Sequence, residues 1–137
     1  MTRVVFDQEI MGLIGVIGRL VKVPIKDLFK EGDVLYCIVE PGQIGKAIGK
    51  GGENIRRVNN ILKKKVKFVE YGVSAVNLVR NLIYPTRVDD IREVEGVVEI
   101  ESADRKVKGF LIGRSGSNLE FLNRVVRRYF DVEVKVV

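Results

Sequence analysis

The sequence contains no histidine, no tryptophan and one cysteine, Cys37. Without histidine the chain cannot form the usual zinc sites, a Ser–His–Asp triad or a Cys–His pair. A single cysteine forms no internal disulfide and no multi-cysteine metal site. Cys37 lies in the apolar run 34–39, where a small buried side chain is a better interpretation than a nucleophile. Most hydrolytic chemistry is thereby removed, and we expect neither an enzyme nor a cofactor.

Long apolar runs are also lacking. The uncharged stretch 10–18 is too short to span a bilayer. Asp7 and Glu9 precede it and no small-residue cleavage site follows, so it does not resemble a signal peptide. We therefore expect a cytoplasmic protein with no membrane partner.

What is present indicates a folded, basic protein. The 137 residues are 46% hydrophobic and 31% charged, a balance typical of a globular chain. The net charge of +6 favours a polyanionic partner, although a slightly basic surface alone would explain it. Residues 1–70 carry 13 Lys and Arg against 8 Asp and Glu, a net +5, and residues 71–137 carry 11 against 10. If nucleic acid binds, the first half should supply more of the salt-dependent affinity.

The chain contains an internal repeat. Residues 48–55 read Ile-Gly-Lys-Gly-Gly-Glu-Asn-Ile, and residues 112–119 read Ile-Gly-Arg-Ser-Gly-Ser-Asn-Leu. Each copy has another glycine four residues before its first motif glycine. A fixed-period match of this kind indicates two copies of one module. We predict two domains, 1–71 and 72–137, each near the lower size limit for an independent core.

Hydrophobic periodicity gives both copies the same order of elements. Asp7 can cap a first helix that Pro24 ends, Phe6 can pack on Met11 as a hydrophobic staple, and Ser74 can cap the corresponding helix of the second copy. The predicted further helices are 44–48, 53–62, 74–83, 105–112 and 117–129, and the predicted strands are 25–29, 33–40, 66–71, 87–92, 97–101 and 132–136. Each copy reads helix, strand, strand, helix, glycine loop, helix, strand, which is an α+β fold.

The glycine loops 49–52 and 113–116 each join two short helices. Glycine accepts positive φ and allows close approach of another backbone. The helix that follows directs its free N–H groups and positive dipole end at the loop, which favours phosphate. Lys50 and Arg114 add a full charge there. Such a loop can grip a sugar-phosphate backbone without reading sequence.

Bases would need an apolar groove beside each loop. The candidates are Ile44, Ile48 and Ile55 in the first copy and Leu111, Ile112 and Leu119 in the second, with one side in the core and the lip in the groove. Lys46 and Lys108 on the short helices add charge. Lys63–Lys65 suits either phosphate contact or a solvated turn, whereas Arg124, Arg127 and Arg128 are interpreted as a solvent face. The carboxylates of 89–90, 99 and 101 are interpreted as strand edges.

Residues 48–55 resemble the signature of the KH domain, and a helix and strand ahead of the core resemble its type II variant. The resemblance implies two tandem type II KH domains, each a three-stranded mixed sheet covered by helices, with Gly-x-x-Gly between two core helices. Ser115 departs from the pattern, but the bracketing glycines are retained. The implied RNA-binding residues are Gly49, Lys50, Gly51, Gly52, Gly113, Arg114, Ser115, Gly116, Lys46, Ile48, Ile55 and Lys108.

Two such modules with a short join resemble the tandem KH unit of NusA transcription factors, and the chain is similar to the short archaeal members of that family. That family implies binding of single-stranded nascent RNA, a role in transcription termination or antitermination, and RNA polymerase as a partner. An RNA-binding protein of ribosome assembly or RNA processing would share every residue argument. A protein-interaction scaffold that has lost RNA binding is a further alternative.

A nucleotide-handling enzyme fits less well. A Walker loop requires glycine five residues before Gly49, where Ile44 stands, and Ser or Thr after Lys50, where Gly51 stands. The dinucleotide fingerprint requires glycine at position 54, which is Asn54. We therefore expect no small-molecule substrate.

Overall fold

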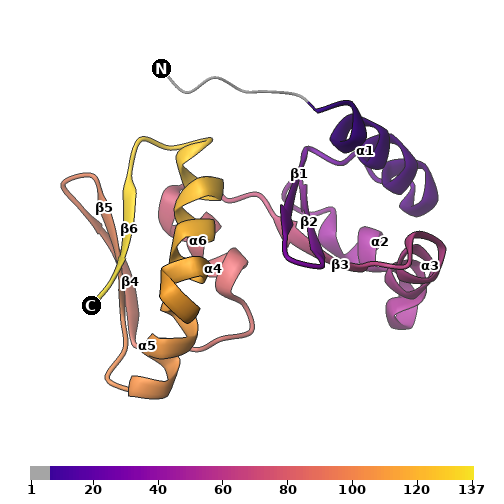
Figure 1. Cartoon of the computed structure of the whole chain (residues 1–137). Helices are drawn as coiled ribbons and strands as arrows, with labels where there is room; N and C mark the ends of the chain where they lie inside the picture. Colours follow the sequence, from indigo (N-terminus) through magenta and orange to yellow (C-terminus); the bar gives the residue numbers. More distant parts are fainter. Residues whose placement is uncertain (1–6) are drawn as a thin grey trace. The chain divides into compact units, whose positions relative to one another are not determined.

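The computed structural model describes residues 7–137. They form two compact units, divided between Tyr71 and Gly72, each made of a three-stranded sheet and helices (Figure 1). No helix in this range is both long enough and apolar enough to cross a membrane.

The first unit has a mixed sheet of order β1-β2-β3, in which β1 and β2 are antiparallel and β2 and β3 are parallel. The Asp7 carboxylate accepts a hydrogen bond of 2.7 Å from the Glu9 amide, so the predicted cap is confirmed, while Phe6 of the predicted staple lies outside the described residues. The elements are α1 (Gln8–Val21), β1 (Asp27–Glu31), β2 (Val34–Val39), α2 (Ile44–Ile48), a short 3₁₀ turn (Lys50–Gly52), α3 (Glu53–Leu62) and β3 (Lys65–Glu70).

The core of this unit lies between the helices and one face of the sheet. Alternate residues of β2, Leu35, Cys37 and Val39, are buried there, as the two-residue period of a strand requires. Helix α1 contributes Ile17 and Val21, and the other apolar residues of its stripe pack against the same cluster. Ala47 of α2 and Val58 of α3 complete the contact, so burial against the sheet holds both short helices beside the glycine loop.

The second unit repeats this arrangement, with sheet order β4-β5-β6, an antiparallel β4–β5 pair and a parallel β5–β6 pair. Ser74 Oγ accepts from the Asn77 amide at 3.2 Å, confirming the predicted cap of its first helix. The elements are α4 (Ala75–Ile83), β4 (Asp90–Val94), β5 (Val97–Glu101), α5 (Arg105–Ile112), a short 3₁₀ turn (Arg114–Gly116), α6 (Ser117–Arg127) and β6 (Glu133–Val136). The predicted element order and the α+β class are thus confirmed in both units.

Two strands begin and end later than predicted. Strand β1 runs to Glu31 instead of Phe29, and β4 runs to Val94 instead of Arg92. Both strands continue into tight hairpins, because Gly32 adopts φ +57°, and Glu95 and Gly96 adopt φ +49° and +77°. Positive φ at the turn residues gives a hairpin the twist of its strands. The predicted strand bounds rest on apolar content, which carries no information about these turns.

Cys37 is fully buried in the first core, which confirms its predicted packing role. Burial raises the pKa of its thiol to about 12. Because the thiolate is the reactive form, we expect native protein at neutral pH to react with a thiol reagent such as iodoacetamide far more slowly than protein unfolded in urea. Mass spectrometry of the two samples measures this, and equal rates would contradict the buried position.

Candidate nucleic-acid interface

The two glycine loops have the same backbone conformation. The first glycine of each, Gly49 and Gly113, has φ and ψ of 81° and 167° or 77° and 173°. The third residue has 61° and 20° at Gly51, and 55° and 28° at Ser115. The last glycine of each loop also has positive φ. Two segments 64 positions apart therefore adopt one geometry, as the repeat predicts.

The first glycine is required at this turn for a second reason. A Cβ added to Gly49 would lie 2.8 Å from the side chain of Asn54, and one added to Gly113 would lie 2.8 Å from that of Asn118. Asn54 Nδ2 donates to the Lys46 carbonyl at 3.0 Å, and Asn118 Nδ2 donates to the Leu111 carbonyl at 3.0 Å. Through these hydrogen bonds each asparagine connects the helix after the loop to the helix before it. Sequence reasoning gave them no role, although both copies carry asparagine at the matching position.

The loop tips lie at the surface of their units. Lys50, Gly51, Arg114 and Ser115 are all exposed. At Gly51 no atom of the described residues beyond its chain neighbours would lie within 4 Å of an added Cβ. Each tip leads directly into α3 or α6, so the positive end of the helix dipole faces the loop, although the first amide of each helix, Glu53 or Ser117, already donates to the Lys50 or Arg114 carbonyl. The arrangement can present N–H donors and one cation to an anion.

The predicted neighbours of the loops occupy different positions. Lys46 is exposed on α2, three residues before Gly49. Lys108 is half-buried on α5 and matches Ile44 of the first copy, whereas Phe110 takes the place of Lys46. Phe110 has 66% of its surface exposed, so the second loop has an aromatic ring where the first has a charge.

The predicted apolar residues divide between core and surface. Ile44, Ile48 and Ile55 are partly buried and pack against the first core. Leu111 is completely buried, so it belongs to the core and not to a groove, while Ile112 is 37% exposed. Leu119 lines a groove, as predicted for the lip.

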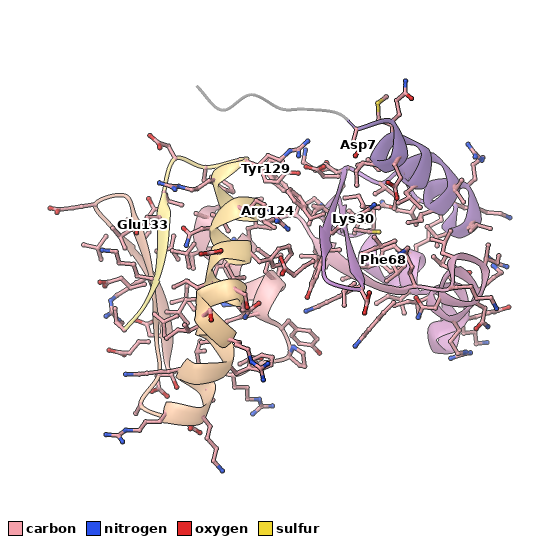
Figure 2. The ribbon with its side chains drawn as sticks, viewed as in Figure 1. Asp7, Lys30, Phe68, Arg124, Tyr129 and Glu133 are labelled. Carbon is pink, nitrogen blue, oxygen red and sulfur yellow. The ribbon has the colours of Figure 1, made fainter. Side chains whose placement is uncertain are left out.

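That groove lies in the second unit between α6 and β6 and has a volume of about 710 Å³. Figure 2 shows Arg124 on α6 and Glu133 on β6, one residue from each wall. Its lining is Gly116, Leu119, Glu120, Asn123, Arg124, Arg127, Glu133, Val134, Lys135 and Val136. Gly116 places the glycine loop at one end of the groove. Arg124 and Arg127 are exposed, as predicted for a solvent face, and they also line this groove.

In each unit a second asparagine joins the helix after the glycine loop to the last strand of the sheet. Asn123 Oδ1 accepts from the Val134 amide at 2.8 Å, and its Nδ2 donates to the Val134 carbonyl at 3.1 Å. In the first unit Asn59 Oδ1 accepts from the Val66 amide at 2.8 Å. The helix after each loop is thus bonded to the last strand of its own sheet, a contact that sequence spacing did not indicate.

The basic turn of the first unit lies at the same end of the helix as Asn59. Lys63, Lys64 and Lys65 line a hollow with Asp33 and Asn59. Farther along β3, Lys67 lies 5.7 Å from the centre of the Tyr36 ring. Burial, and then the charge of Lys65, lower the pKa of Lys67. Lysine side chains therefore lie along the edge strand β3 of the first sheet as well as at the glycine loop of this unit.

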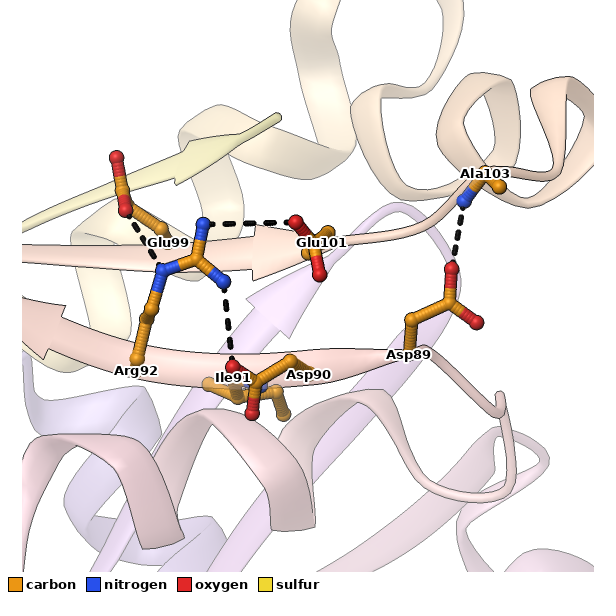
Figure 3. Close-up of polar contacts among 7 residues, drawn as sticks. All are labelled: Asp89, Asp90, Ile91, Arg92, Glu99, Glu101 and Ala103. Atoms are coloured by element: carbon orange, nitrogen blue, oxygen red, sulfur yellow. Dashed lines mark hydrogen bonds and ion pairs between the residues drawn. The ribbon is translucent and has the colours of Figure 1, made fainter.

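The carboxylates of β4 and β5 have structural partners. Arg92 Nε donates to Glu99 at 3.0 Å and Nη1 donates to Asp90 at 3.2 Å, while Nη2 lies 3.6 Å from Glu101 (Figure 3). Hydrogen bonds to Asp90 and then Glu99 raise the pKa of Arg92. The Asp89 carboxylate accepts from the Ala103 amide at 2.8 Å. Among residues 7–137 no group of His, Cys, Asp and Glu side chains could hold a metal ion.

The chain is similar in fold and in sequence to known proteins. The solved crystal structure of the protein APE1850 matches 96% of this chain and all of its own, with a TM-score of 0.73 and 27% sequence identity. The "probable transcription termination protein NusA" of Methanocaldococcus jannaschii is 33% identical over 95% of this chain and 73% of its own length. The protein of the same name from Halococcus morrhuae is 31% identical over 78% of each chain. No protein-family model matches.

The two helix-covered mixed sheets are consistent with a protein built from two KH-like units. Its sequence relatives then identify the family. The chain belongs to the archaeal NusA-like transcription termination proteins.

Proposed function

We propose that each unit is a type II KH domain, residues 1–71 and 72–137, and that the protein binds single-stranded RNA at its two Gly-x-x-Gly loops. The observation that carries the proposal is the shared loop geometry, with matching positive φ at both loops and an exposed cation in each. In the second unit the loop also opens onto an apolar-floored groove. A phosphate-holding loop beside such a groove suits a strand whose bases are splayed from its backbone.

The residues proposed for this contact are Lys46, Ile48, Gly49, Lys50, Gly51, Gly52 and Ile55 in the first unit and Lys108, Gly113, Arg114, Ser115 and Gly116 in the second. To them the structure adds the groove walls on α6 and β6. The termination factors among the relatives favour a nascent transcript as the RNA and RNA polymerase as a partner. We propose no catalytic step for this site and place the protein in the cytoplasm, where transcripts form.

Single-stranded RNA is expected to bind more tightly than a duplex of the same sequence, because paired bases cannot enter the groove. With about four phosphates bound, log K should fall with log salt at a slope of about −2.8, or about fiftyfold between 50 and 200 mM. Fluorescence anisotropy of labelled RNA at several salt concentrations measures both. A duplex that binds as well as a single strand would rule out binding of bases in the groove, and co-purification with ribosomal particles instead of RNA polymerase would favour the ribosome-assembly alternative.

A further inference from the structure

The charge beside the two loops is reversed at one matched position. In the first unit Arg56 Nη1 donates to the Gly51 carbonyl at 2.5 Å, and it would lie 3.1 Å from a Cβ on Gly52. The guanidinium therefore rests against the loop. The residue 64 positions later is Glu120, which lines the groove of the second unit. One loop thus has a cation at its rim and the other has a carboxylate.

A second reversal lies on the opposite wall. The amides of Val66 and Val134 donate the same hydrogen bond to the Oδ1 of an asparagine on the preceding helix, so these two residues are equivalent. The residues before them are then equivalent too, and these are Lys65 in the first unit and Glu133 in the second. The first unit carries cations where the second carries two glutamates facing its groove from both walls.

The two glutamates suit bases better than phosphates. Within residues 7–137 neither the Glu120 nor the Glu133 carboxylate makes a hydrogen bond or an ion pair. Between them the groove floor is apolar, formed by Leu119, Val134 and Val136. Carboxylates repel phosphate but accept hydrogen bonds from the amino groups of bases, such as cytosine N4.

We infer that the second groove selects adenine and cytosine, which carry an exocyclic amino group where uracil carries O4, over uracil, and that Glu120 and Glu133 determine this choice. The inference rests on the proposed RNA binding. Uracil presents the O4 carbonyl where adenine presents N6–H₂ and cytosine N4–H₂, so its lone pairs would face a carboxylate. Arg127 and Lys135 line the same groove and supply cations for the backbone. The first unit, with Arg56 and Lys65 at the matching sites, binds backbone charge without this choice.

The test observes each unit separately in the intact chain. Amide signals of Gly49, Gly51 and Gly52 report the first loop in a ¹⁵N NMR titration, and those of Gly113 and Gly116 report the second. The probes are tetranucleotides of adenylate, cytidylate or uridylate, a length that matches the roughly four nucleotides held by one such module. The second loop should bind adenylate and cytidylate at least about fivefold more tightly than uridylate. The first loop should bind all three within about twofold.

Two variants separate base selection from simple repulsion. Glu120→Gln with Glu133→Gln keeps the side-chain shape but allows the amide to donate to uracil O4, so uridylate should gain most and the preference should disappear. Glu120→Arg with Glu133→Lys installs the first unit's residues and should strengthen all three probes, with uridylate gaining most, so that the three bind with similar affinity.

The outcomes distinguish the inference from the function on which it rests. If none of the loop signals moves with any probe, the proposed RNA binding is wrong. If the loops bind RNA but the second loop holds uridylate as tightly as adenylate and cytidylate, the inference is wrong. An equal rise for all three probes in the glutamine variant would also overturn it, because the glutamates would then act through charge alone.

Discussion

Replacing Lys50 and Gly51 together by aspartate is expected to weaken RNA binding by the first unit by about 3 kcal/mol, roughly a hundredfold. The change removes the loop cation and places two carboxylates where phosphate would lie. The fold should tolerate it, because Lys50 is exposed and no described atom lies within 4 Å of a Cβ on Gly51. Ser115 already holds φ +55° at the equivalent position of the second loop. Anisotropy with single-stranded RNA measures affinity, and circular dichroism confirms the fold.

The control makes the same change in charge away from the loop. Lys22 and Gly32 are exposed, and both have positive φ, at +58° and +57°. Lys22→Asp with Gly32→Asp therefore matches the loop variant in net charge, and Gly32, like Gly51, is a glycine with positive φ. It should lose only the modest affinity expected from a general change of charge. Equal affinity of the folded loop variant and the wild type would show that this loop does not bind phosphate.

Gly72→Ala is expected to destabilise the second unit by about 3 kcal/mol, through overpacking. Gly72 is buried, and a Cβ there would lie 2.3 Å from the amide nitrogen of Leu78 and 2.8 Å from the Asn77 carbonyl carbon. Both atoms belong to the backbone of α4 and cannot rotate away, so the start of the helix must shift. For a unit of this size the melting temperature should fall by about 10 °C or more.

Gly109→Ala is the matched control in the same unit. Gly109 is exposed within α5, and no described atom outside the backbone of that helix lies within 4 Å of a Cβ placed on it. Alanine is favoured over glycine inside a helix, so this change should stabilise by up to about 1 kcal/mol. Thermal and urea unfolding followed by circular dichroism compare the two variants. A Gly72→Ala protein that melts at or above the wild-type temperature would contradict the close packing described for α4.

Much of the fold was predictable because its signals are local. The helix caps at Asp7 and Ser74 and the apolar stripe of α1 depend on residues within a few turns of each other. The glycine loops were predictable because the same pattern occurs twice in the chain. A single copy would have been a weak signal. Strands β1 and β4 were misplaced at their ends because positive φ in the hairpins, not apolar content, decides where they stop.

The groove was less predictable because it is formed by distant contacts. One wall of the groove is helix α6 and the other is strand β6, which pairs in parallel with β5. The spacing of residues in the sequence does not show that β6 lies beside α6. Leu111 and Leu119 are both apolar and near the loop, yet one is core and the other lines the groove. The direction in which each side chain points decided their roles. The repeated asparagines at 59 and 123 were visible, but their bonds to β3 and β6 were not.

The hydrogen bonds between Asn123 and Val134 also affect whether another chain can pair with the edge of this sheet. Strand β6 is at the border of its sheet, where unpaired backbone groups usually invite a peptide to add as a further strand. At Val134 the asparagine amide already occupies both the N–H and the carbonyl. A neighbouring polypeptide therefore cannot continue the ladder through this residue, which disfavours edge-to-edge pairing at β6.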